Sequence, residues 1–152
     1  MKNAIFVVLI AIGLTFSGCT WSAQKKIVDN KLDLSNQQLK KVPDYVFEQV
    51  NLEELDISNN QITGALQAEI RNLKNLKVLN AGNNLMAGVP AEIGQLSNLR
   101  ILDLSNNQLT GLPYELGNLK NLETFNISGN KYSTSDLDTI LGSLSTSTEI
   151  IK

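Results

Sequence analysis

One spacing dominates this chain of 152 residues, because apolar side chains and an asparagine recur in the order LxxLxLxxN every 23 or 24 residues. The five copies begin at Asp29, Leu52, Leu76, Leu99 and Leu122. The first copy is degenerate, since a polar residue stands in place of its first leucine. A unit of this length cannot bury its own apolar side, whereas stacked copies bury a continuous core. The repeat therefore predicts a solenoid.

The LxL stretch inside each copy predicts a short β-strand, because side chains alternate between the two faces of a strand. We expect one set of residues to point into the core: Leu55, Ile57, Leu79, Ala81, Leu102, Leu104, Phe125 and Ile127. Successive strands about 4.8 Å apart form a parallel sheet, and the bulkier return segments need more room. This mismatch bends the stack into an arc with the sheet on its concave side.

The segments between strands carry a second pattern, GVPAEIGQLSNL at 88–99 and GLPYELGNLKNL at 111–122. With the strand motif, this pattern resembles the leucine-rich repeat family from Ile27 to about Ser133. The resemblance implies an α/β repeat solenoid with a short parallel concave sheet and an irregular or 3-10 convex side. Segment 62–70 resembles the plant-type variant and holds one residue more, and Gln67 there replaces the proline found at 43, 90 and 113. The five repeats are predicted to span 27–134.

Both ends of a solenoid need caps, since each would otherwise expose the core and a sheet edge. After Tyr132 the repeat fails, and we predict a C-terminal capping helix within 135–152, with Ser135 as N-cap and Asp138 in the first turn. Its apolar residues fall at helical spacing: Leu137, Ile140, Leu141 and Leu144. Residues 145–152 are expected to fray. The degenerate first repeat is the expected N-terminal cap, through Tyr45, Val46, Phe47 and Val50.

The first eighteen residues, MKNAIFVVLIAIGLTFSG, have the charge, apolar run and small residues of a secretory signal peptide, and are too short for a spanning helix. Phe16-Ser17-Gly18-Cys19 resembles the lipobox of bacterial lipoproteins, although Phe16 replaces the usual leucine. The resemblance implies a diacylglycerol on the Cys19 sulfur and a mature protein beginning there. The alternative is an ordinary signal peptide beside a chance cysteine. Cys19 is the only cysteine, and an unmodified exported thiol would be a liability.

Residues 19–26 then form a short membrane-proximal tether. We expect an exported protein that is lipid-anchored to the bacterial membrane, and Thr20 after the cysteine favours the outer membrane if the host has two membranes. Trp21, Lys25 and Lys26 either contact lipid headgroups or belong to a solvated polar tether. The host's envelope type and the oligomeric state are left open.

Several kinds of chemistry are not expected in this chain. It has no histidine, and its one cysteine is assigned to the anchor, so we predict no enzyme, no metal site and no cofactor besides the covalent lipid. A net charge of −2 also gives no reason to expect nucleic acid as a partner. Carboxylates remain, as Asp33, Asp56 and Asp103 fall in one outward column with Asn80 and Asn126. These residues perform acid and base work, bind calcium or, as we favour, bond to their neighbours across the sheet.

A ladder of asparagines follows the strands, at Asn60, Asn84, Asn107 and Asn130. A ligand site is one interpretation, but an amide at a fixed point past each strand can satisfy backbone groups of the turns that would otherwise be buried without partners. We therefore predict a structural role. A second series, Asn51, Asn75, Asn98 and Asn121, precedes the strands and is expected to serve turns there.

The outward concave positions are mostly small and polar, except Val78 and Ile101. These two are expected to be neighbours, with a charged and polar border: Lys77, Arg100, Asp56, Asn80 and Asp103. An apolar centre with a charged rim is typical of a modest protein-binding patch, although β-branched residues also simply favour strands. We predict a membrane-anchored, non-catalytic protein with a protein partner on its concave face. The alternative is an envelope scaffold that binds through its convex face, and a glycan-active enzyme is a distant third.

Overall fold

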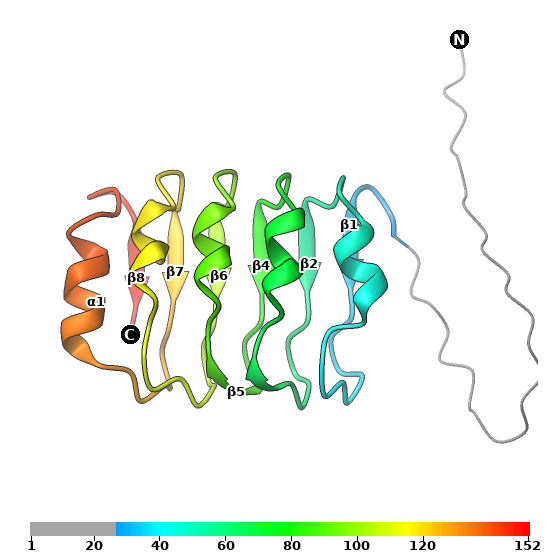
Figure 1. The fold of residues 1–152 in the computed structure, drawn as a ribbon, viewed down its shortest axis with the longest axis horizontal. Coiled ribbons are helices and arrows are strands. Elements are labelled where there is room, and N and C mark those ends of the chain that lie inside the picture. Colours follow the sequence, from blue (N-terminus) through cyan, green and yellow to red (C-terminus); the bar gives the residue numbers. More distant parts are fainter. Residues whose placement is uncertain (1–26) are drawn as a thin grey trace, which may run out of the picture.

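The computed structural model describes residues 27–152, and it forms a row of stacked turns with a parallel sheet along one side (Figure 1). The sheet has the order β1-β2-β4-β6-β7-β8. Its strands are β1 Lys31–Asp33, β2 Glu54–Asp56, β4 Val78–Asn80, β6 Ile101–Asp103, β7 Thr124–Asn126 and β8 Glu149–Ile151. Equivalent residues of successive repeats pair in register, as Leu55 does with Leu79 and Leu79 with Leu102. The predicted signal peptide, the predicted lipid anchor at Cys19 and the predicted tether lie outside the described residues.

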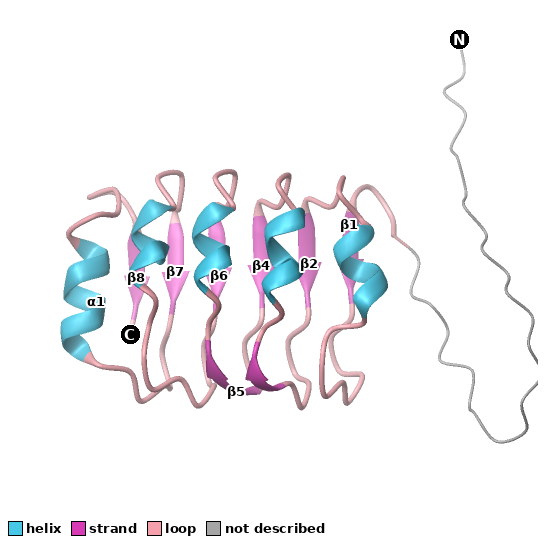
Figure 2. Cartoon of the chain, in the orientation of Figure 1, coloured by secondary structure: helices cyan, strands magenta, loops and turns pink. Residues whose placement is uncertain are grey.

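Four 3-10 helices cover the opposite side of the sheet (Figure 2). They are η1 Asp44–Glu48, η2 Ala68–Asn72, η3 Ala91–Gln95 and η4 Tyr114–Asn118. Each is preceded by an extended residue, which is proline in three repeats. Proline fixes φ near −65°, and Gln67 takes the same conformation with φ −67° before η2. The missing proline of the second repeat therefore leaves the turn intact.

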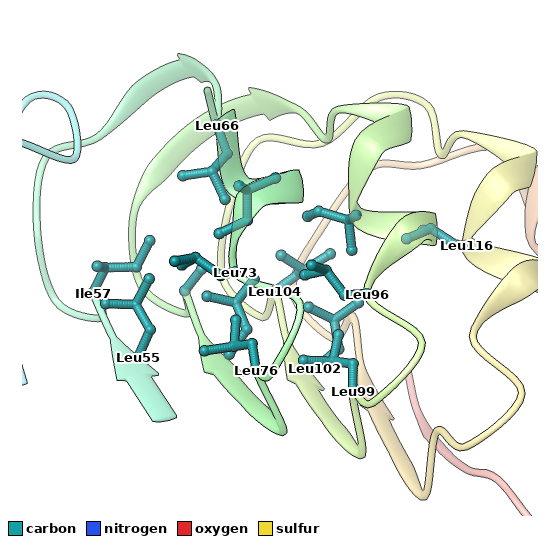
Figure 3. Close-up of a cluster of buried hydrophobic side chains, with 14 of the residues drawn as sticks. Leu55, Ile57, Leu66, Leu73, Leu76, Leu96, Leu99, Leu102, Leu104 and Leu116 are labelled. Carbon is teal, nitrogen blue, oxygen red and sulfur yellow. The ribbon is translucent and has the colours of Figure 1, made fainter. Parts of the chain in front are cut away.

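The core lies between the sheet and the 3-10 helices and is filled mainly by leucine from every repeat (Figure 3). All of the residues predicted to point inward are at most 1% exposed: Leu55, Ile57, Leu79, Ala81, Leu102, Leu104, Phe125 and Ile127. Leucines of the return segments, such as Leu73, Leu96 and Leu119, meet them from the convex side and are fully buried. The predicted leucine-rich arc and its strand register are confirmed.

A second, two-stranded sheet lies where the chain leaves the concave side. Strand β3, Thr63–Ala65, pairs in parallel with β5, Leu85–Gly88, and the register shifts between Gly64 and Ala65. Gly64 has φ +70°, a left-handed conformation that favours glycine. At this shift the consecutive residues Gly64 and Ala65 pair with Met86 and Gly88, so Ala87 of β5 is the unmatched residue.

The C-terminal helix α1, Thr134–Leu141, begins two residues earlier than predicted. Ser133 occupies the N-cap position in place of Ser135, and Asp136 lies in the first turn in place of Asp138. The buried face is the predicted one, because Leu137, Ile140 and Leu144 are 2%, 0% and 8% exposed. At the N-terminal end, Val46 and Phe47 are buried as expected, whereas Val50 is 54% exposed and takes no part in that cap.

The expectation that residues 145–152 fray is wrong. Glu149–Ile151 forms β8 and adds a sixth parallel strand to the sheet, with Thr124 paired to Glu149. The Glu149 N–H donates to the Glu123 carbonyl at 2.8 Å, and the Ile127 N–H donates to the Ile151 carbonyl at 2.9 Å. Helix α1 returns the chain over the convex side as a 3-10 helix does, so the tail meets the edge of β7. No LxxLxL motif marks this strand, because the end of the stack has no further repeat to cover.

The first strand is flanked by a different device. Val28 and Lys31 form an antiparallel bridge in which each N–H donates to the other residue's carbonyl, at 3.2 and 2.9 Å. Asp29 and Asn30 make this tight turn with φ values of 51° and 60°.

Within residues 27–152, no helix is long and apolar enough to cross a membrane.

Candidate partner-binding face

Two rows of side chains cross the concave face of the sheet and point away from the core. The first concave row contains Lys31, Glu54, Val78, Ile101, Thr124 and Glu149. The second concave row contains Asp33, Asp56, Asn80, Asp103, Asn126 and Ile151. Strand β8 contributes Glu149 and Ile151, which the sequence argument missed because it gave this segment no strand.

The apolar centre of this face is less symmetrical than expected. Val78 and Ile101 are paired neighbours on β4 and β6. Ile101 is 39% exposed, but Val78 is only partly exposed. Ile151, on β8, is also 39% exposed. The face therefore carries two separated isoleucines and a partly covered valine.

Ion pairs run laterally between neighbouring repeats at the start of the strands. We call Lys31–Glu54, Glu53–Lys77 and Arg100–Glu123 the lateral ion pairs, and each has an N–O distance of 2.6 Å. The hydrogen bond to Glu54, followed by its negative charge, raises the pKa of Lys31. Exposed pairs of this kind contribute little to stability. Their effect is to neutralise Lys77 and Arg100, which the sequence placed at the patch border without assigning them partners.

The carboxylates of the second concave row are tied to their neighbours. Asp56 accepts the backbone N–H of Ser58 at 2.8 Å and the side-chain amide of Asn80 at 3.1 Å. Asp103 repeats this pattern with Ser105 at 2.8 Å and Asn126 at 3.1 Å. These bonds hold both carboxylates in place and agree with the favoured interpretation of the column. Among residues 27–152, no group of three or more Asp, Glu, Cys or His side chains could hold a metal ion.

The asparagine ladder binds backbone groups of two repeats at once. The Asn107 amide donates to the carbonyls of Leu104, Ser105 and Ala81, at 3.1, 3.1 and 3.0 Å, and its oxygen accepts the Met86 N–H at 3.0 Å. Its exposed fraction is 7%. The other members of the ladder bond in the same way: Asn60, Asn84 and Asn130. Since these amides are occupied by the backbone, they are not offered to a partner.

Three members of the second asparagine series join neighbouring repeats and do not bond within their own turn. Asn75 donates to the Val50 carbonyl at 2.9 Å, Asn98 to that of Lys74 at 2.8 Å, and Asn121 to that of Ser97 at 2.8 Å. Each acceptor lies in the turn of the preceding repeat. A sequence pattern locates such an amide but cannot say which of two stacked turns it contacts.

A further asparagine column was missed by the sequence argument. Its residues take left-handed φ values between 51° and 59°: Asn36, Asn59, Asn83 and Asn106. Asparagine tolerates this conformation better than most residues. The available signal was the first asparagine in the SNN and GNN triplets, and the glycine that replaces it at 129, with φ +70°.

The convex side has two shallow hollows. One lies between η1 and η2 and is lined by Asp44, Phe47, Glu48, Gln67, Glu69 and Asn72. The other follows β5 and reaches α1, and its lining includes Tyr114, Glu115 and Asp136. Tyr114 is 60% exposed. These hollows are the convex features that a rival binding mode would use.

Comparison with known proteins gives one consistent family. The model described as "Leucine rich repeat" matches residues 30–86, and the one described as "Leucine Rich repeats (2 copies)" matches residues 97–141. No curated protein matches the chain at a significant level. Together the two matched segments span more than half of the chain.

Solved structures of this family resemble the chain in fold and sequence. A leucine-rich repeat protein of Leptospira interrogans is 40% identical with a TM-score of 0.74, over 80% of this chain and 30% of that one. The ectodomain of the receptor kinase SOBIR1 from Arabidopsis thaliana is 36% identical with a TM-score of 0.61, over 67% of this chain and 56% of that one. The plant peptide hormone receptor RGFR1, solved in complex with RGF2, is 40% identical with a TM-score of 0.61, over 66% of this chain and 16% of that one. The chain thus spans about a third to a half of the first two. With its strand register, its asparagine ladder and these matches, the chain belongs to the leucine-rich repeat family.

Proposed function

We propose that this protein binds a protein or peptide partner on its concave sheet face and does not catalyse a reaction. One observation carries the proposal: two complete rows of side chains on the sheet point away from the core, and the core residues are buried without any contribution from them. Because the stability of the fold does not depend on these side chains, their identity can be adapted to recognise a partner. Leucine-rich repeat domains are typically non-catalytic interaction modules, and the plant receptor RGFR1 is one such structure solved with a bound partner.

The chemistry of the face suits a small interface. Ile101 presents exposed apolar surface beside Val78, while Asp103 and the lateral ion pairs supply a polar border. Buried apolar anchors surrounded by polar groups carry most of the energy of protein interfaces. The second concave row adds fixed carboxylates that need no reorganisation on binding.

The direct test replaces Val78 and Ile101 together with aspartate. Both side chains point away from the core, so the free energy of unfolding should stay nearly unchanged. A partner bound at these residues should bind at least about 2 kcal/mol more weakly. The partner is recovered by affinity pull-down with the lipidated protein from its own cells, and affinity is measured by calorimetry. Full affinity in a double variant that melts normally would discard the concave assignment.

A second candidate places the partner on the convex face, and the exposed Tyr114 beside its hollow favours it. This envelope-scaffold hypothesis expects binding to survive the concave substitutions. Binding should fail instead in a Glu92→Lys and Glu115→Lys variant. Glu92 pairs with Arg71 at 3.6 Å, so a melt must accompany that measurement. Cross-linking from concave and from convex positions separates the two faces independently.

We also propose that a lipid on Cys19 holds the protein at a bacterial membrane, the outer one if the host has two. The support is the Phe16-Ser17-Gly18-Cys19 motif after an apolar run. Two or more acyl chains give stable anchoring at about 0.8 kcal/mol per buried methylene. Cys19→Ser should abolish labelling with a radioactive fatty acid and move the protein to the aqueous phase of a detergent partition. Equal labelling of the serine variant would contradict the lipid anchor.

A further inference from the structure

The concave face keeps its positive charges inside ion pairs and leaves negative charges outside them. Within the two concave rows and the residues just before each strand, Lys31, Lys77 and Arg100 are the cations, and each belongs to a lateral ion pair. Across residues 27–152, Glu149 makes no ion pair. At these positions of the part of the chain that the structure describes, the face therefore offers carboxylates to a partner but no unpaired cation.

Asp56 and Asp103 are the central charges of this surface. Both accept hydrogen bonds from neutral donors alone, namely a backbone N–H and an asparagine amide each. Such bonds fix the orientation of a carboxylate without cancelling its charge. Each carboxylate also retains room for a further donor, since a carboxylate offers about four acceptor positions.

The apolar contact lies next to these charges. Val78 and Ile101 occupy the first concave row on β4 and β6, while Asp56 and Asp103 occupy the second row on β2 and β6. Two strand spacings, about 9.6 Å, separate β2 from β6. A bound segment can thus place an apolar side chain on Ile101 with cationic groups near the carboxylates.

Resting on the proposed function, we propose that the partner's binding segment is rich in lysine or arginine and carries an apolar residue that contacts Ile101. Cationic side chains form strong charge-assisted hydrogen bonds to carboxylates that are already oriented. An acidic segment would be repelled by Asp56, Asp103 and Glu149. It would find Lys31, Lys77 and Arg100 already paired with glutamates. Complementary charge of this kind selects partners and accelerates their association.

A binding experiment with defined probes tests the sign of this preference. The probes are a short labelled peptide of alternating lysine and leucine and the same peptide with glutamate in place of lysine. With the full lipidated chain in neutral detergent, anisotropy should show at least about tenfold tighter binding of the lysine peptide at low salt. This preference should shrink when salt is raised to about 0.5 M. Equal binding of the glutamate peptide would overturn the inference.

Variants distinguish this face from a general attraction to an acidic protein. Asp56→Asn with Asp103→Asn should weaken binding of the lysine peptide about tenfold. The matched control, Glu69→Gln with Glu115→Gln, removes the same charge from exposed convex positions and should change it less than about twofold. Equal losses in the two variants would overturn the inference.

A third variant should change the affinity for the lysine peptide in the opposite direction, and it leaves the residues of the second concave row unchanged. Lys77→Gln with Arg100→Gln releases Glu53 and Glu123 from their ion pairs, so the lysine peptide should bind several-fold more tightly. Weaker binding would contradict the proposal. This test remains valid even if the variant that carries Asp56→Asn and Asp103→Asn fails to fold.

The failure of this inference can be told from that of the proposed function. A cellular partner that is lost on Val78→Asp with Ile101→Asp, but binds through an acidic segment, overturns the charge preference alone. A partner that is lost only on convex substitution overturns both. A partner that is lost on the concave substitutions and binds through a basic segment supports both.

Discussion

The two faces of the solenoid restrict their residues in different ways. On the concave side, a Cβ added at Gly82 would lie 2.9 Å from the Ser105 hydroxyl, which is the movable end of a side chain. On the convex side, a Cβ at Gly94 would overlap the Glu115 carbonyl group, with 2.7 Å to its carbon atom. Backbone cannot move aside as a side chain can. The convex position is therefore more restricted than the concave one, where the nearest atom belongs to a side chain.

The largest expected effect lies in the core that both faces share. Leu104→Ala should reduce the free energy of unfolding by about 2 to 5 kcal/mol, because it leaves a cavity between sheet and return segments. Ile101→Ala, on the same stretch of chain but facing outward, is the matched control and should cost clearly less. Chemical denaturation measures both. Equal losses would mean that the concave side is as restricted as the core.

Gly94→Ala tests the convex side alone. The new methyl group meets backbone of the next 3-10 helix, so the loss should be about 1 to 3 kcal/mol. Gly111→Ala is the control, since its nearest contact would be an ordinary 3.7 Å to Asp136. Thermal or denaturant melts that leave Gly94→Ala as stable as Gly111→Ala would remove the difference between the faces.

The asparagine ladder joins the two faces, because it lies where the chain leaves the sheet. Asn107→Ala should cost about 1 to 3 kcal/mol through the buried carbonyls and N–H that lose their partner. The adjacent exposed Gln108→Ala should change stability by less than about 0.5 kcal/mol. If denaturant melts give Asn107→Ala the same small change, the ladder is dispensable and the argument for its structural role fails.

The smallest effect concerns pH at the convex side of the first repeat. Burial raises the pKa of Tyr45, so the folded state keeps this proton more tightly than the unfolded chain. Stability should therefore be intact below the ordinary tyrosine pKa of about 10 and decline as pH rises above it. Tyr45→Phe should lose less stability than the wild type between about pH 9 and pH 11 in denaturant melts. An unchanged pH slope in that variant would contradict this assignment.

Much of this fold was predictable, because every repeat must bury the same apolar positions of its LxL stretch. The LxL alternation correctly indicated the buried residues from Leu55 to Ile127, and the recurring spacing placed Val78 beside Ile101. Prediction failed at the C-terminus, where the sequence no longer follows the repeat and offers no second copy for comparison. Ser135 was taken for the N-cap that Ser133 provides, and β8 was missed because its pairing depends on the edge that β7 leaves.

The candidate surface was predictable in its positions but not in its charges. The sequence could place Lys77 and Arg100 near Val78, yet it could not show that each lies 2.6 Å from a glutamate one repeat away. It likewise could not distinguish the partly covered Val78 from the more exposed Ile101. Such differences depend on side-chain rotamers of neighbours about 24 residues apart, which no single repeat encodes.

The sequence alone determined the family, the strand register and the inward direction of the LxL residues, because these follow from a period that hydrophobic burial must satisfy in each copy. Tertiary structure decided which turn each second-series asparagine contacts, that the tail adds β8, and that the concave cations are neutralised laterally. The physical reason is the same in each case. These features are contacts between stacked repeats, and their partners are fixed only when the stack has formed.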